Sequence, residues 1–328
     1  MSDPFFYLDN RLVGSDQTNL CRGCPQARTG GFCGVRIQPE CLRIASDGTV
    51  RVSLAAPAQT WFDAISRLGE VLHLTRNPVT VMACLGQAPA LDDWQNPVLP
   101  RDCFGCFAPN LAEYASLWAV REVSPLGALH GFEARDVSGT VFERVLLPSG
   151  ARRDLFEQLV TEYQSPPEEA GPWSPANHAW SNRRRASLAG RIPWLRSRWD
   201  SGDRNVRRLP VRFVAKLLAA AARMRLPLRT TSYHAAQMRT LLWTPQTYAD
   251  TMRGDGSLDF FEGSGVGLHL NRRAIASVWL WTGRCSCCTE SQWSVELADS
   301  RDHIGLAIMT GDKAAESEWR KLVKSCLP

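Results

Sequence analysis

Four cysteines near the start of the chain have the spacing of a metal site. Cys21 and Cys24 form a Cys-x-x-Cys pair, and Cys33 and Cys41 follow after eight and seven intervening residues. Thiolates on a short, turn-rich segment are the ligands that tetrahedral zinc and iron–sulfur clusters take. The pattern therefore predicts a metal site at Cys21, Cys24, Cys33 and Cys41, and the spacing does not decide between zinc and an iron–sulfur cluster.

Two further cysteine groups lie deeper in the chain. Cys103-Phe-Gly-Cys106 is a second Cys-x-x-Cys pair, and Cys285, Cys287 and Cys288 form a third group. A thioredoxin-type redox motif follows a strand in a β-α-β unit, and that context is missing here. Either group could join the N-terminal set or form its own thiol site, so their role stays open.

The chain ends and the cysteine count indicate a cytoplasmic protein. Met1–Asn10 has acidic residues and no basic region, so it does not read as a signal peptide. An odd total of 11 cysteines without such a signal argues against a disulfide framework. The longest apolar stretch, Phe213–Ala222, is interrupted by Lys216 and is too short to cross a membrane.

Arginines concentrate in one strip near the middle of the chain. A strip of this kind suits an anionic partner, such as nucleic acid, a lipid surface or a small molecule with carboxylates, or it forms a solvated linker. The net charge of +5 is low for a nucleic-acid binder, and no recognition module is visible, so nucleic acid is not expected. The strip comprises Arg183, Arg184, Arg185, Arg191, Arg196, Arg198, Arg204, Arg207 and Arg208.

The elements that would position these residues occur twice. Leu72–Met82 and Leu228–Met238 are both eleven residues long, and each follows a segment with apolar residues at helical spacing. Those helical segments are Trp61–Gly69 and Phe213–Arg225. The order Ala-Ser-x-Trp then appears in both halves, in 114–119 and in 275–280, at nearly the same separation along the chain.

Each Ala-Ser-x-Trp strand is followed by the same series of elements. A second strand ends in an Asp and a polar turn, a third strand follows, and a helix closes the half. The first half has strands at 130–134 and Val141–Leu147, the turn Asp136–Gly139 and the helix Ala151–Glu162; the second has strands at 293–297 and Ile304–Met309, the turn Asp299–Asp302 and the helix Ala314–Cys326.

These repeats predict an α+β fold class, a tandem structural repeat with two large, mostly antiparallel β-sheets and helices outside. Strand runs joined by short turns imply antiparallel pairing, with the helices segregated from the sheet. A Pro- and Gly-rich start marks a linker between the halves, in which Leu188, Ile192 and Leu195 predict a helix within Asn182–Trp199. The expected parts are a Cys-rich segment 1–45, a first repeat 46–163, a Pro/Trp/Arg-rich linker 164–208 and a second repeat 209–328.

Several of these segments resemble the cytosolic haem-utilisation family, the haemin-degrading HemS and ChuX type. Leu68–Asn77 is similar to the first-repeat signature of that family, and Gly267–Leu270 followed by Ile275–Trp279 is similar to a second-repeat stretch. The segments 217–228 and Glu316–Val323 resemble the opening and closing elements of the second repeat. The resemblance covers about residues 45–325 and implies the tandem-repeat fold, with haem held near the linker.

The resemblance also implies a haem site. The family takes its axial ligand from a linker histidine, and His178 lies at the matching place, about forty residues before Leu217. A neutral imidazole can ligate ferric haem through one nitrogen while the other donates a hydrogen bond. Arg183, Arg184 and Arg185 would meet the propionates, Trp173, Trp180 and Trp194 would cover the ring faces, and His269 is a second-choice neighbour. His269 and His73 each alternate with leucines, a pattern that more often indicates a structural role.

One departure bears on catalysis. The family places a distal arginine about six residues before the first-repeat tryptophan, and this chain has Ala112 there; Tyr114 or Arg121 could substitute. The expected function is therefore haem binding in intracellular haem iron utilisation, as a carrier or as a haem-degrading enzyme, with an electron donor or a haem-transport partner. The alternative is a Cys-ligated zinc or iron–sulfur metalloprotein on the same fold that no longer binds haem.

Overall fold

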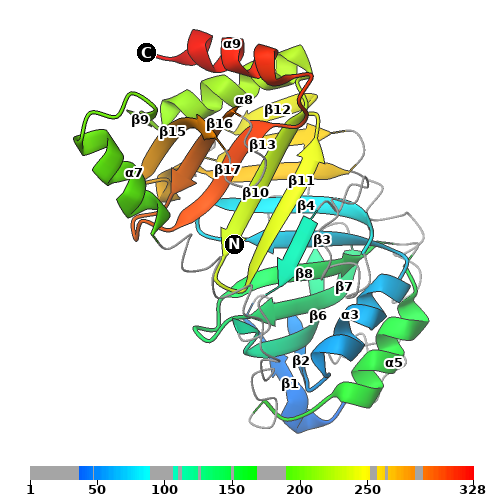
Figure 1. Cartoon of the computed structure of the whole chain (residues 1–328). Helices are drawn as coiled ribbons and strands as arrows, with labels where there is room; N and C mark the ends of the chain where they lie inside the picture. Colours follow the sequence, from blue (N-terminus) through cyan, green and yellow to red (C-terminus); the bar gives the residue numbers. More distant parts are fainter. Residues whose placement is uncertain are drawn as a thin grey trace. The chain divides into compact units, whose positions relative to one another are not determined.

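In the computed structural model the chain forms two compact units, and Figure 1 shows the helices and strands of both. Unit 1 holds the described parts of Met1–Thr75, Cys84–Val98 and Pro109–Asn177, and unit 2 those of Arg76–Ala83, Leu99–Ala108 and His178–Pro328. The strands belong to two large antiparallel sheets, which confirms the predicted α+β class. The described residues are 37–46, 48–88, 106–109, 113–124, 127–148, 151–167, 190–251, 257–262, 265–284 and 291–328.

Unit 1 has antiparallel strands in the order β1-β2-β6-β7-β8-β3. Its two α-helices, α3 and α5, lie side by side in Figure 1. The elements are η2 (Pro39–Cys41), β1 (Leu42–Ile44), β2 (Val50–Leu54), α3 (Ala58–Arg67), β3 (Glu70–Arg76), β4 (Thr80–Gln87), β6 (Ser116–Ser124), β7 (Gly127–Arg135), β8 (Val141–Leu147) and α5 (Arg153–Tyr163). The last residue of β3, Arg76, and the first part of β4, residues 80–83, belong to unit 2.

The helices of unit 1 cover one face of its sheet. Trp61 and Ile65 of α3 are four residues apart, so they share one side of the helix, and both are buried. The ring of Phe132 on β7 lies 4.6 Å from Trp61 and 4.8 Å from Phe156 of α5. Because side chains alternate along a strand, Glu133 then lies on the opposite face.

Unit 2 contains the order β11-β10-β17-β16-β15-β9 and the meander β12-β13-β14. In Figure 1, α8 and α9 lie side by side, and α7 lies next to β9 and β15. The elements are α7 (Arg191–Asp200), β9 (Val206–Leu209), α8 (Arg212–Met224), β10 (Leu228–His234), β11 (Gln237–Trp243), β12 (Thr247–Thr251), β13 (Ser257–Glu262), β14 (Val266–Asn271), η4 (Arg272–Ala274), β15 (Ser277–Arg284), β16 (Ser291–Ala298), β17 (Ile304–Thr310) and α9 (Glu316–Cys326). The short strand β5 (Cys106–Pro109) follows β11 in the strand order.

The strand order confirms the predicted tandem repeat. The order β2-β6-β7-β8-β3 in unit 1 recurs as β9-β15-β16-β17-β10 in unit 2. The side-chain contacts recur too: the indole nitrogens of Trp118 and Trp279 both lie 3.0 Å from the hydroxyl of the serine two residues earlier. The predicted Asp turns match as well, because Asp136 and Asp299 each accept two backbone N–H groups from the turn that follows.

The predicted elements agree with the structure apart from their ends. β8 has the predicted bounds, whereas the predicted helices at 61–69, 151–162 and 314–326 begin or end one to three residues away. In the linker, the helix is confirmed over Arg191–Asp200, and residues 181–189 lie outside the described part. Among the described residues, no helix is long and apolar enough to span a membrane.

Residues 76–83, which comprise the turn at 77–79 and the adjoining ends of β3 and β4, belong to unit 2. The side chain of Asn77 is the centre of this turn, because its Nδ2 lies 2.8–3.0 Å from three oxygen atoms of unit 2. Those oxygens are Ser232 Oγ and the carbonyls of Tyr233 and Gly305, and Asn77 Oδ1 accepts from the backbone N–H groups of Val79 and Thr80. Gly305 permits this approach: a Cβ there would lie 2.5 Å from the Cβ of Val79.

Candidate functional site

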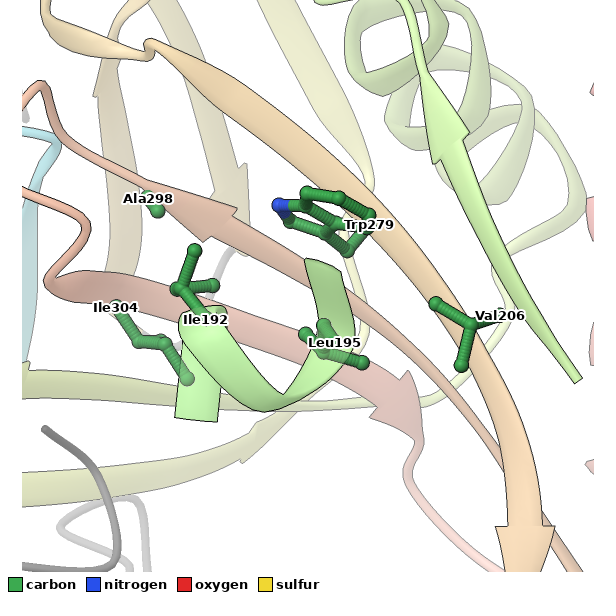
Figure 2. Close-up of a cluster of buried hydrophobic side chains, with 6 residues drawn as sticks. All are labelled: Ile192, Leu195, Val206, Trp279, Ala298 and Ile304. Carbon is green, nitrogen blue, oxygen red and sulfur yellow. The ribbon is translucent and has the colours of Figure 1, made fainter. Parts of the chain in front are cut away.

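The described end of the linker, helix α7, packs on one face of the sheet of unit 2 (Figure 2). Ile192 and Leu195 are three residues apart, so they point to the same side, and both are fully buried. They contact a cluster drawn from four strands, composed of Val206, Trp279, Ala298 and Ile304. Burying these side chains stabilises the docked helix by about 1.5–3 kcal/mol for each fully buried aliphatic residue.

Arg191, the first residue of α7, adds a polar anchor beside this cluster. Its guanidinium donates two hydrogen bonds to the Glu296 carboxylate on β16, at 2.9 and 2.6 Å. The same guanidinium lies 4.6 Å from the ring of Trp194 and 4.7 Å from the ring of Trp281, within cation–π range of both. α7 thus presents a cationic and aromatic surface that is held on the sheet by a paired charge.

Several arginines of the predicted basic strip have carboxylate partners. Arg196 makes two hydrogen bonds with Asp302, at 2.7 and 2.9 Å, and Arg198 pairs with Asp203. On β9, Arg207 and Arg208 are exposed, and the Arg208 guanidinium lies 6.0 Å from the Trp279 ring. Part of the strip therefore holds α7 and the turns in place, and part of it faces solvent.

Unit 1 repeats the Trp–Glu pairing of unit 2. Trp118 lies opposite Glu133 in the β6–β7 register, as Trp279 lies opposite Glu296. Three arginines meet the buried Glu133 carboxylate: Arg51 and Arg135 donate at 3.0 and 2.9 Å, and Arg144 Nε lies 3.4 Å away. Burial alone would raise the pKa of Glu133, but the Arg144 charge and the hydrogen bonds from Arg51 and Arg135 outweigh it, so the pKa is lowered.

A second buried polar group lies on β3, β8 and the residues before β6. Glu143 lies 2.7 Å from Nε2 of His73 and accepts a hydrogen bond of 2.6 Å from the Tyr114 hydroxyl. Burial first, and then the Glu143 charge, raises the pKa of Tyr114 well above 10.0. These contacts agree with a structural role for His73. Tyr114 is one of the two residues expected to substitute for a distal arginine, and its hydroxyl is hydrogen-bonded to Glu143.

His269 lies on β14 with a carboxylate beside it. Its Nδ1 lies 2.7 Å from Asp259 on β13, and its backbone carbonyl accepts a hydrogen bond from Thr80. The side chain is 12% exposed. The structure thus places this second-choice haem neighbour on the meander of unit 2 in a histidine–carboxylate pair.

Most residues of the predicted haem and metal sites lie outside the described residues, as does Ala112, which stands where the family has a distal arginine. The site residues concerned are His178, Trp173, Trp180, Arg183, Arg184, Arg185, Cys21, Cys24 and Cys33. Cys41 is described: it ends η2, is fully buried, and its Sγ lies 3.9 Å from Gln38 Oε1. Within the described ranges, no group of three or more His, Cys, Asp or Glu side chains has the arrangement of a metal site.

Sequence reasoning missed the two buried glutamates, although a signal was present. Glu133 and Glu296 occupy the same place in matching strands, and each is a lone acidic residue in an otherwise mainly apolar run. A carboxylate in such a place predicts a buried partner, because an unpaired buried charge is costly. The partner Arg191 lies 105 residues from Glu296, so only the fold identifies it.

Comparisons with known proteins show what fold these units build. No family model and no curated protein matches the chain. Among solved structures, holo-PhuS, a heme-binding protein from Pseudomonas aeruginosa, matches with a TM-score of 0.64 at 19% identity, covering 84% of this chain and 86% of that chain. ChuS, an Escherichia coli heme oxygenase, matches with a TM-score of 0.64 at 13% identity, covering 86% and 90%. The chain therefore has the fold of PhuS and ChuS, as its resemblance to the HemS and ChuX type predicted.

Proposed function

We propose that this protein binds haem and serves the intracellular use of haem iron. The observation that carries the proposal is the likeness of fold to a heme-binding protein and a heme oxygenase over more than four fifths of the chain. Fold alone does not fix function, so the proposal also needs a suitable site. Helix α7, at the end of the linker, carries side chains that suit such a site.

The surface around α7 matches the chemistry of haem. A porphyrin is a flat aromatic ring with two propionates, and α7 carries Trp194 and Trp199 on its exposed side together with arginines. Arginine pairs well with carboxylates and stacks on aromatic rings. His178 precedes Arg191 by thirteen residues, so it belongs to the same linker as α7.

The other histidines leave His178 as the best ligand candidate. His73 and His130 are buried in unit 1, and each is within hydrogen-bond distance of another side chain. His234 Nδ1 accepts from the backbone N–H of Ala236, and His269 pairs with Asp259. The remaining one, His303, is 64% exposed in the β16–β17 turn. We therefore propose His178 as axial ligand, with Trp180 and Arg183–Arg185 around the ring and its propionates.

Carriage of haem is the better supported role. Ring cleavage needs a distal donor, and the position at which the family has arginine is Ala112. Of the two candidate substitutes, Tyr114 is hydrogen-bonded to Glu143, and Arg121 lies opposite His130, which contacts helix α5. A carrier would act in the cytoplasm and pass haem to a transport or degrading partner; a degrading enzyme would also need an electron donor.

A haemin titration tests the proposal. The wild-type protein should develop a Soret band with saturable 1:1 binding, and His178→Ala should lose or shift that band. His303→Ala is the matched control, because His303 is the most exposed described histidine and should not change the spectrum. A wild-type protein that binds no haemin would refute haem binding, and an unchanged spectrum of His178→Ala would refute only the ligand assignment.

The N-terminal cysteines are a separate proposal. Cys21, Cys24, Cys33 and Cys41 are proposed to hold zinc or an iron–sulfur cluster, on the spacing of the four thiols. Metal analysis of the purified protein should find about one zinc ion, or cluster iron together with sulfide. Cys24→Ser should lose that metal and leave haemin binding intact, and a metal content at background would end this proposal.

A further inference from the structure

Arg121 on β6 is a largely buried cation with no described partner. Only 8% of the residue is exposed, and no side chain in the described part of the chain forms a hydrogen bond or ion pair with its guanidinium. Arg144, a buried arginine on the opposite face of the sheet, shows the usual arrangement, because the Glu122 carboxylate lies 2.8 Å from it. None of the Arg121 guanidinium nitrogens is among the fully buried polar atoms without a partner, so the charge reaches solvent, where an anion can contact it.

A second arginine and a histidine lie beside Arg121. In the β6–β7 register Arg121 stands directly opposite His130, on the sheet face that α5 covers. Nη2 of Arg153, the first residue of α5, lies 3.3 Å from His130 Nε2. Since arginine only donates, His130 accepts at Nε2 and is neutral there.

The electrostatics of this group favour an anion. Burial first, and then the charges of Arg153 and Arg121, lower the pKa of His130 to about 3, so His130 adds no charge at neutral pH. Glu157 lies 3.2 Å from Arg153, and the exposed Arg152 and Asp154 pair with each other. One positive charge is therefore left over, and the eleven-residue helix α5 begins at Arg153, so the positive end of its dipole lies at the same place.

The second repeat lacks all three basic residues at the matching places. The pair Thr282 and Trp293 occupies the register position of Arg121 and His130, and α9 begins with Glu316 where α5 begins with Arg153. The shared fold therefore does not require this positive group. The basic group occurs in unit 1 and not at the matching places of unit 2, which favours a specific role such as ligand binding over a role in the shared fold.

From these observations we infer that Arg121 and Arg153, at the N-terminus of α5 and beside His130, form a binding site for an oxyanion, the phosphate or carboxylate group of a small ligand. Both guanidiniums offer the paired N–H donors that such groups accept. The site uses none of the linker residues that are proposed to hold haem, although Arg121 is also one of the two candidate substitutes for a distal arginine.

Thermal unfolding at constant ionic strength tests the site, with inorganic phosphate and acetate as the probes. Phosphate or acetate should raise the midpoint of the wild-type protein, and the stronger of the two identifies the ligand group. Arg121→Met and Arg153→Gln should each weaken binding at least about tenfold, the loss expected when one charge-assisted contact is removed. Arg223→Met is the matched control, because Arg223 is exposed on α8 and should leave the response unchanged.

Calorimetric titration measures phosphate and acetate binding directly at a temperature at which each variant is folded, so a variant of lower stability can still be compared with the wild type. Binding that is measurable in wild type and Arg223→Met, and at least about tenfold weaker in Arg121→Met, supports the site. If the wild type binds neither phosphate nor acetate, the proposed site is refuted. The site is also refuted if Arg121→Met and Arg153→Gln both bind the anion as tightly as the wild type.

Discussion

Replacing Arg191 with Met should destabilise unit 2, because the Glu296 carboxylate then loses both of its guanidinium hydrogen bonds. The side chain of Glu296 is only 6% exposed, so water cannot fully replace Arg191. Methionine is an unbranched apolar side chain that can still pack beside the Trp194 and Trp281 rings, so the change removes the charge and little of the packing.

The geometry sets the size of the effect. Removing one partner of a fully buried pair costs about 3–5 kcal/mol. Arg191 is 23% exposed, so water offsets part of that cost, and we expect a loss of about 2–3 kcal/mol. The double variant Arg191→Met/Glu296→Met buries no charge, so it should lose only about 1 kcal/mol or less.

Urea unfolding of the wild type, the two single variants and the double variant forms a double-mutant cycle. The expected coupling between Arg191 and Glu296 is about 2 kcal/mol or more. Hydrogen exchange of peptides from α7 and β16 assigns the change to unit 2. Arg196→Met is the control, because the Arg196–Asp302 pair is 51% and 35% exposed and should contribute less than about 1 kcal/mol.

Additive losses in the cycle would refute the reasoning. If the double variant were destabilised by the sum of the two single changes, the carboxylate would not depend on the guanidinium. An Arg191→Met protein as stable as wild type would lead to the same conclusion.

Three further changes test the polar groups of the fold. Asn77→Ala should cost about 2–4 kcal/mol in urea unfolding, because several buried backbone and side-chain groups of unit 2 lose their partner together, and a loss below about 1 kcal/mol would contradict this. Gly305→Ala should cost about 1–3 kcal/mol through its clash with Val79, and Val79→Ala in the same chain should recover part of it; no recovery would mean that the clash lies elsewhere. The pKa of Tyr114 is raised in the folded state, so its contribution is complete below the unfolded value of about 10 and is lost as pH rises above it. Tyr114→Phe should therefore be less stable at neutral pH but show a shallower decline of stability in alkaline unfolding curves, and an equally steep decline would contradict the assignment.

The local elements were predictable because their signals are local. Apolar spacing predicted the helices, the Asp turns at Asp136 and Asp299 predicted two tight connections, and the repeated Ala-Ser-x-Trp order predicted matching strands. The linker helix was predicted from three residues, and the burial of Ile192 and Leu195 confirms two of them.

The partners of the charged residues could not be predicted from spacing. Arg191 and Glu296, or Arg51 and Glu133, meet only because distant strands and helices pack together. The resemblance supplied His178, which composition and periodicity could not single out, and its place lies outside the described residues. The β12–β14 meander was likewise missed, since the one part of it that was considered, around His269, read only as an isolated strand face.

Residues 76–83 come from the first half of the chain but belong to unit 2, so the chain cannot be cut in the linker without separating them from that unit. Because these residues pack within unit 2 and fill the space beside Gly305, severing the backbone in the linker would leave the C-terminal piece without them. Such a fragment would have to recruit the missing turn from its N-terminal counterpart in order to complete its fold. The second copy of the repeat thus depends on a short segment that lies between strands of the first.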